Sequence, residues 1–346
     1  MARANLPAEL VLQIIECLIP SNPPVAFAPS HPITRTLLSL ALVCRLTSRT
    51  ARQILTKHCL YIDSANRLNQ LLQQSNLPLN LPRHLSLLLS PFPVDNLDIP
   101  PTVLQVDQLS SIISNTLTRL VIDMPLRHLY PEEDINSLRP LLRAAFARMQ
   151  NLEEFTSVRD ELYLSITHGT QEPAIWASWS RLRRLALYNV AVESSQFLCG
   201  LRQCSNLTHL ILVRPDGLAE EVSPKQMQAQ SGGGLGFLPC LQHLVVVNTA
   251  PGFLQSTPFD QRTWEESFVG RLHKLKGLGG GVDGDGDTSD EESVASYLSL
   301  RVPFGRDEDE IEICQEWLAA RATDGTLWGL SDELQTLLWS SSNSTV

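Results

Sequence analysis

A short leucine phrase, L-x-x-L-x-(L/I/V), recurs along the middle of the chain. Copies begin at Leu117, Leu182, Leu207 and Leu241, and a degraded copy pairs Leu152 with Phe155. The starts are 35, 30, 25 and 34 residues apart, so a helix-length segment separates each phrase from the next. Because side chains alternate along a strand, the last two apolar positions of each copy lie on one side. One such unit cannot bury its apolar edge alone, so the pattern predicts a leucine-rich-repeat-like solenoid over residues 117–275.

A second interpretation of the same pattern stays open, namely an irregular α/β core with several similar strands. The spacing is uneven, and the Asn or Cys usually found three positions after the last leucine of such a repeat is missing. Asn189 and Asn248 stand two positions after it instead. Under both interpretations the fold class is α/β.

Residues 1–60 are predicted to be helical. Pro7 suits a first helical turn, and Leu6, Leu10, Ile14 and Leu18 recur every four residues as the apolar stripe of an amphipathic helix. The five prolines of residues 20–32 predict a loop. A second helical run follows over residues 34–55. Its apolar residues occupy more than one face, so we expect this run to be buried on several sides.

The order of these residues resembles the F-box, and its close resembles that of fungal members of that family. The shared positions are Leu6-Pro7-Ala8-Glu9-Leu10, then Ile14, Ile15 and Leu18, then Leu37, Leu40 and Ala41, and finally Val43-Cys44-Arg45. The resemblance covers about residues 4–58. It implies a three-helix unit that docks on a Skp-family adaptor and so joins a cullin-RING ubiquitin ligase. The alternative is an ordinary helical hairpin whose leucines pack only inward.

Carried over by position in the motif, the resemblance implies a set of adaptor contacts. These are Leu6, Pro7, Leu10, Ile14, Leu40 and Val43. Leu18 and Leu37 are equally suited to an internal position. The sequence departs from the motif at two places: Thr47 stands where an aromatic is usual, and the loop of residues 20–32 is longer than usual. Either departure would reduce the affinity for the adaptor.

The resemblance implies a substrate-recognition subunit of an SCF-type E3 ligase, which presents a protein substrate and has no catalytic chemistry of its own. The alternative function is an interaction scaffold whose F-box-like docking unit does not serve ubiquitination. In a leucine-repeat strand, the residues between the leucines point to the concave face. That rule gives candidate substrate contacts at Arg184, Tyr188, His209, Ile211, His243 and Val245.

Charge and cysteine content exclude several other classes of function. The chain has a net charge of −10, and residues 283–316 alone hold twelve acidic residues against two arginines. No basic stripe suited to nucleic acid is present. The seven cysteines are scattered without a CxxC pair, so we expect no disulfide framework or zinc site. With no signal peptide and no membrane-spanning apolar run, the sequence favours a cytoplasmic or nuclear protein that does not bind membranes.

Motifs for catalysis or cofactor binding are weak. Gly279-x-Gly281-x-x-Gly284 has the spacing of a dinucleotide fingerprint but lacks the preceding strand and the following helix. Asp283-x-Asp285-x-Asp287 opens like a calcium loop but lacks the glycine at position six and the glutamate at position twelve. We therefore expect no enzyme activity, no cofactor and no bound metal.

Composition divides the chain into five parts. These are a helical unit at 1–60, a connecting region at 61–116, the repeat-like region at 117–275, a Gly-rich and acidic linker at 276–297, and a helical cap at 298–346. Ser289 precedes Asp290-Glu291-Glu292, the setting that an acid-directed kinase prefers, so the linker is a candidate for phosphorylation at Ser289.

Overall fold

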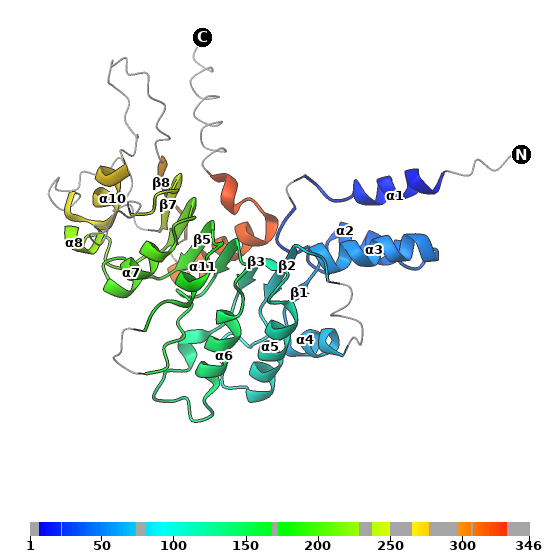
Figure 1. The fold of residues 1–346 in the computed structure, drawn as a ribbon, viewed down its shortest axis with the longest axis horizontal. Helices are drawn as coiled ribbons and strands as arrows, with labels where there is room; N and C mark the ends of the chain where they lie inside the picture. Colours follow the sequence, from blue (N-terminus) through cyan, green and yellow to red (C-terminus); the bar gives the residue numbers. More distant parts are fainter. Residues whose placement is uncertain are drawn as a thin grey trace, which may run out of the picture.

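The computed structural model describes residues 7–21, 23–73, 81–167, 172–227, 237–249, 265–276, 296–305 and 307–330. Its centre is one parallel sheet of eight strands whose spatial order is their order in the chain (Figure 1). The strands are β1 (Tyr61–Ile62), β2 (Leu85–Leu89), β3 (Leu117–Ile122), β4 (Glu154–Ser157), β5 (Arg184–Tyr188), β6 (His209–Val213), β7 (His243–Asn248) and β8 (Ser296–Arg301). The mixed α/β class expected from the sequence is confirmed.

The leucine phrase falls on or beside successive strands of this sheet. Four copies precede or enter β3, β5, β6 and β7, and the degraded copy at Leu152 leads into β4. The register is regular from β5 to β7, since Leu185 lies beside Leu210, and Leu210 beside Leu244. The sheet extends beyond residues 117–275 at both ends, because β1 and β2 come from residues 61–116 and β8 follows residue 295.

One face of the sheet is covered by helices that connect the strands. They are α4 (Ala65–Leu72), α5 (Pro100–Ile113), η2 (Leu126–His128), α6 (Leu138–Ala147), η3 (Ile175–Ser178), α7 (Ser195–Gln203), α8 (Pro224–Met227) and α10 (Phe268–Lys276). Strand residues such as Leu185, Leu187 and Leu210 form the main apolar core with residues of these helices, including Leu142 and Phe146. This core makes the connecting helices and the sheet one packed body.

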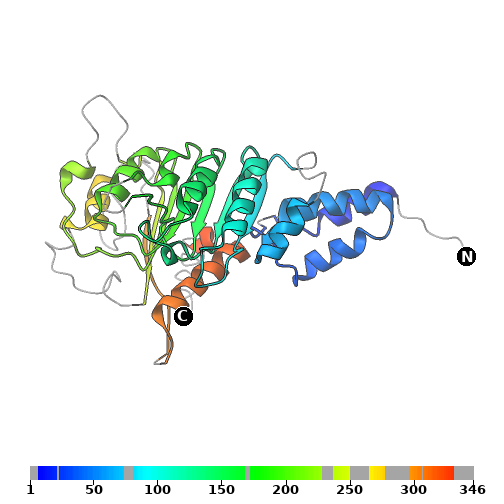
Figure 2. The same ribbon diagram turned by 90° about the horizontal axis from the view of Figure 1, so that it is seen from below.

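Within the described residues, one long helix covers the opposite face. α11 (Glu310–Asp324) and the short η5 (Leu327–Gly329) lie across the sheet on the side away from the connecting helices (Figure 2). The alternate strand residues, among them Tyr188, Ile211 and Val245, form a second core with Cys314 and Leu318 of α11. Burial on both faces explains why the central strands are almost continuously apolar.

The N-terminal helices form a separate unit that projects beyond β1 (Figure 2). They are α1 (Ala8–Glu16), α2 (Pro32–Leu40) and α3 (Arg45–His58). The helical run expected over 34–55 is interrupted between α2 and α3 because Thr47 caps the start of α3. The Cys44 backbone N–H donates to Thr47 Oγ1 over 3.2 Å. The core of this unit is small, with Ile15, Leu37 and Ala51 as its buried apolar residues.

The proline-rich loop packs between this unit and the sheet. Residues 24–27 are buried, and Val25 and Ala26 belong to the core beneath α11. The Phe27 backbone N–H donates to the carbonyl of His58 over 2.8 Å. Arg119 of β3 donates through Nη1 to the carbonyl of Pro23 over 3.3 Å. The loop is therefore the joint that connects the helical unit to the sheet.

Within the described ranges, no helix is both long enough and apolar enough to cross a membrane.

Candidate functional site

Helix α1 exposes apolar side chains to solvent. Leu10 is 47% and Ile14 is 57% exposed, although both are large aliphatic residues. They are four residues apart, so they lie on the same face of the helix, while Ile15 points into the core of the unit. Together with Gln13, Cys17 and Leu18 they line a shallow, largely apolar groove.

A second exposed apolar group lies at the end of α2 and the start of α3. Leu42 is 87% and Val43 is 69% exposed, and Leu38 and Leu46 are exposed as well. The expectation that residues 34–55 are buried on several sides is therefore wrong. The cause is the turn at residues 41–44, which turns these side chains away from the small core. We refer to Leu10, Ile14, Leu38, Leu42, Val43 and Leu46 as the apolar surface of the helical unit.

Exposed cations accompany this surface. The side chains of Arg35, Arg45, Arg49 and Arg52 are all exposed on α2 and α3. The exposed acidic residues of the unit, within its described part, are Glu9 and Glu16 on α1. Exposed apolar groups accompanied by arginines suit an apolar protein partner with acidic side chains at its rim.

The structure places the expected adaptor contacts as follows. Pro7, Leu10, Ile14 and Val43 are exposed, and Leu40 is half-buried against the core of the unit. Leu37 is fully buried, which makes it an internal residue. Leu6 lies outside the described residues, as does the phosphorylation candidate Ser289. Leu38, Leu42 and Leu46 were not identified from the motif, although their positions beside Val43 were a usable signal.

The expected substrate contacts on the concave face divide into two groups. Arg184, His209 and His243 are half-buried in one row at the amino ends of β5, β6 and β7. Tyr188, Ile211 and Val245 are at most 3% exposed, because they pack in the core beneath α11. These three residues are therefore not accessible to a substrate while α11 covers the sheet, and their assignment as contacts is corrected.

The half-buried row is a chain of polar contacts across the sheet. Glu154 of β4 accepts from Arg119 Nε and from Arg184 Nη1, each over 2.8 Å. The rings of His209 and His243 lie 4.5 Å apart. Burial, with smaller effects of His243 and Arg184, lowers the pKa of His209 to about 4. The row is also held from outside, since the rings of His209 and Trp328 lie 6.2 Å apart and His243 Nδ1 lies 2.7 Å from Ser296 Oγ.

No group of three metal-ligating side chains occurs among the described residues. No protein-family model matches the chain, and no curated protein is similar to it.

Proposed function

We propose that the chain is the substrate-recognition subunit of an SCF-type ubiquitin ligase. In this proposal, residues 7–58 form an F-box unit that docks on a Skp-family adaptor. The parallel sheet and its helices form an irregular leucine-rich-repeat-like solenoid that presents a protein substrate. The adaptor and cullin-RING partners supply the chemistry, and this chain contributes proximity.

The observation that supports docking most directly is the apolar surface of the helical unit. The helical core of this unit has three buried apolar residues, whereas six large aliphatic residues of its helices and of the turn between α2 and α3 are exposed. Contiguous exposed apolar patches on monomeric proteins commonly mark protein interfaces. Each of the two exposed groups, on α1 and around the turn between α2 and α3, is a candidate for such a patch. Three of the six motif positions, Leu10, Ile14 and Val43, are within this surface, which supports the proposal.

The test is the double substitution Leu10→Asp with Ile14→Asp. Both side chains are exposed, so the folded state tolerates the change. In a complex, each new carboxylate would enter a desolvated apolar contact, which costs several kcal/mol. We expect the recombinant full chain to lose at least about a hundredfold in affinity for a Skp-family adaptor, measured by calorimetry.

A matched control places the same change elsewhere. Leu104 of α5 and Ile135 of the loop before α6 are also exposed large aliphatic residues. The variant Leu104→Asp with Ile135→Asp should keep wild-type affinity. If both double variants bind the adaptor as tightly as the wild type, or if the wild type does not bind it, the docking proposal is wrong.

Thr47 favours a second candidate function, a scaffold that binds the adaptor without supporting ubiquitination. The usual aromatic at this position is absent, and Thr47 is buried as the cap of α3. Purification of the endogenous complex separates the two candidates. Co-purification of adaptor together with cullin supports the ligase, whereas adaptor without cullin supports the scaffold.

A further inference from the structure

A cleft of about 310 Å³ opens at the carboxyl ends of β3, β4, β5 and β6. Its polar lining comes from the residues that directly follow these strands and from α11. They are Arg127, Arg159, Asp160, Asn189, Arg214 and Gln315. In sheets of parallel strands, ligands commonly bind beyond the carboxyl ends, because loops from neighbouring strands converge there. The described residues of the helical unit do not line this cleft, so a ligand site in it is independent of the docking proposal.

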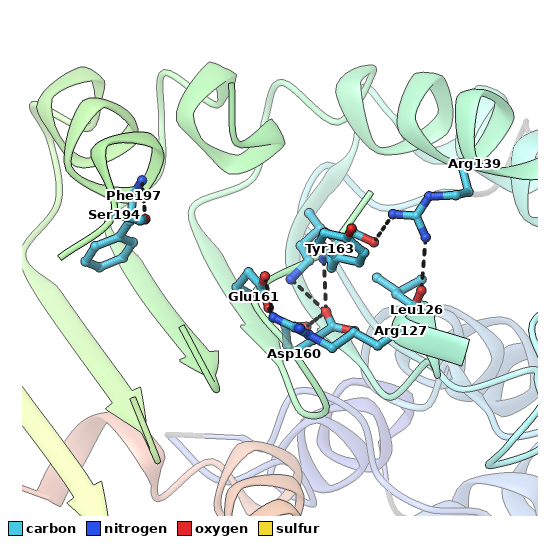
Figure 3. A network of polar contacts seen from close by, with 10 residues as sticks. Leu126, Arg127, Arg139, Asp160, Glu161, Tyr163, Ser194 and Phe197 are labelled. Atoms are coloured by element: carbon cyan, nitrogen blue, oxygen red, sulfur yellow. Dashed lines mark hydrogen bonds and ion pairs between the residues drawn. The ribbon is translucent and has the colours of Figure 1, made fainter. Parts of the chain in front are cut away.

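Three arginines of the lining are held in position by acidic or phenolic groups. Arg127 donates through Nη2 to both carboxylate oxygens of Glu161, over 2.7 and 2.8 Å (Figure 3). Arg159 donates through Nε to Asp123. The third, Arg214, donates through Nη1 to the hydroxyl of Tyr188 over 3.3 Å. A guanidinium group has five N–H donors, so each arginine keeps donors beyond the nitrogen that anchors it.

Two buried polar atoms of the cleft lining have no hydrogen-bond partner within the described part of the chain. One is Oδ2 of Asp160, on a side chain that is 1% exposed, and the other is Nε of Arg127. Asp160 Oδ1, by contrast, accepts from the backbone N–H groups of Leu162 and Tyr163. Figure 3 shows Asp160 and Tyr163 facing one another. Buried polar atoms are nearly always paired, so these two atoms mark the part of the cleft lining where hydrogen bonding within the described chain is incomplete.

We propose that this cleft binds one oxyanionic group, a phosphate or a carboxylate, through Arg127, Arg159 and Arg214. Arginine is the side chain best suited to such groups, because its planar donors match two oxygens at once. The carboxylates of Asp123 and Glu161 fix the guanidinium groups of Arg159 and Arg127 before the ligand arrives, and Glu310 lies 3.8 Å from Nη2 of Arg214. Their negative charge also offsets that of the arginines, so the cleft selects a compact anion by donor geometry rather than by net charge.

Calorimetry with the full-length chain tests this proposal. The probes are inorganic phosphate, acetate, N-acetyl-O-phosphoserine amide and N-acetyl-aspartate amide, with sodium chloride held at matched ionic strength. We expect at least one of these probes to bind saturably, with one molecule of probe per protein chain. The variant Arg159→Gln with Arg214→Gln should weaken that binding by at least about tenfold, since two charge-assisted contacts are removed.

A second variant avoids the ion pairs of the fold. Gln315 lies on α11 at the cleft and is half-buried. Gln315→Glu adds a negative charge there and should also weaken anion binding. The control Arg67→Gln removes an arginine of α4 that pairs with Asp63 and does not line the cleft. This variant should bind the probe like the wild type.

The probes also separate the sources of the anion. If phosphate or acetate binds more tightly than the blocked amino acids, the natural ligand is a small molecule. If a blocked amino acid binds more tightly, the natural ligand is a side chain of another protein. Both results support the site. The proposal is overturned if the wild type shows no saturable binding of any probe. It is equally overturned if Gln315→Glu and the double arginine variant both bind the probe as the wild type does.

Discussion

Asp160 should make the stability of this protein fall as pH rises from about 4 to about 7. Its carboxyl group is fully buried, and burial raises its pKa from 3.8 to about 7, with Glu161 adding to the effect. The folded chain therefore holds a proton that the unfolded chain releases near pH 4. Since the folded state binds more protons over this interval, stability is greatest below it and decreases through it.

The size of the effect follows from the interval between the two pKa values. Each pH unit corresponds to about 1.4 kcal/mol. The interval from 3.8 to about 7 thus gives roughly 4 kcal/mol as the largest contribution of this group. Asp160→Asn replaces the carboxyl group by a neutral group of the same shape. It keeps an oxygen for the N–H groups of Leu162 and Tyr163, to which Asp160 bonds over 2.7 and 3.1 Å.

Urea unfolding at pH 5, 6, 7 and 8, followed by tryptophan fluorescence, measures the difference. Trp176 and Trp179 are both buried, so their emission reports loss of the core. The wild type should lose about 2–3 kcal/mol relative to Asp160→Asn between pH 5 and pH 8, because this range covers about two of the three pH units. Asp95→Asn on the exposed loop before α5 should follow the wild type. Parallel pH profiles for the wild type and Asp160→Asn would refute the reasoning.

Two further substitutions test the packing of α11. Gly325 has a φ of +84°, and an added Cβ would lie 3.1 Å from Pro24 Cα. Gly325→Ala should therefore lower the free energy of unfolding by at least about 1–2 kcal/mol, measured by thermal or urea unfolding. An unchanged unfolding midpoint would show that this turn is not as described. Ile211→Ala should lower the free energy of unfolding by about 2–5 kcal/mol, because the side chain is buried beneath α11. A loss under about 0.5 kcal/mol would show that this face of the sheet is open at Ile211.

Local patterns in the sequence predicted where the strands lie in the chain better than they predicted which elements pack against those strands. The leucine phrase identified the strands from β3 to β7, because each copy records the burial of one strand. β8 (Ser296–Arg301) lacks the phrase and was not found, and β1 has only two residues. The helical cap expected at 298–346 contains α11, but the position of this helix across the sheet does not follow from the sequence. The spacing of Cys314 and Leu318 shows which face of the helix is buried, but it does not show which element that face packs against.

The cleft could not be assembled from sequence patterns alone. Arg127, Arg159 and Arg214 are distant in the chain and belong to no motif. They come together because parallel strands in sequential order bring their carboxyl ends to one edge. The usable signal was their position, since each follows a strand by a few residues. The apolar surface of the helical unit was predicted in part because the motif specifies the positions Leu10, Ile14 and Val43.

The joint at residues 24–27 has a mechanical consequence. Val25 and Ala26 share a core with Leu318 and Leu327, so the helical unit cannot swing relative to the sheet without exposing that core to water. Under the proposed function, a bound protein would be held at a set distance and angle from the adaptor rather than on a tether. Only those lysines of the bound protein that fall within a narrow arc would then reach the ubiquitin-carrying enzyme, so the choice of modified lysine would be determined by geometry.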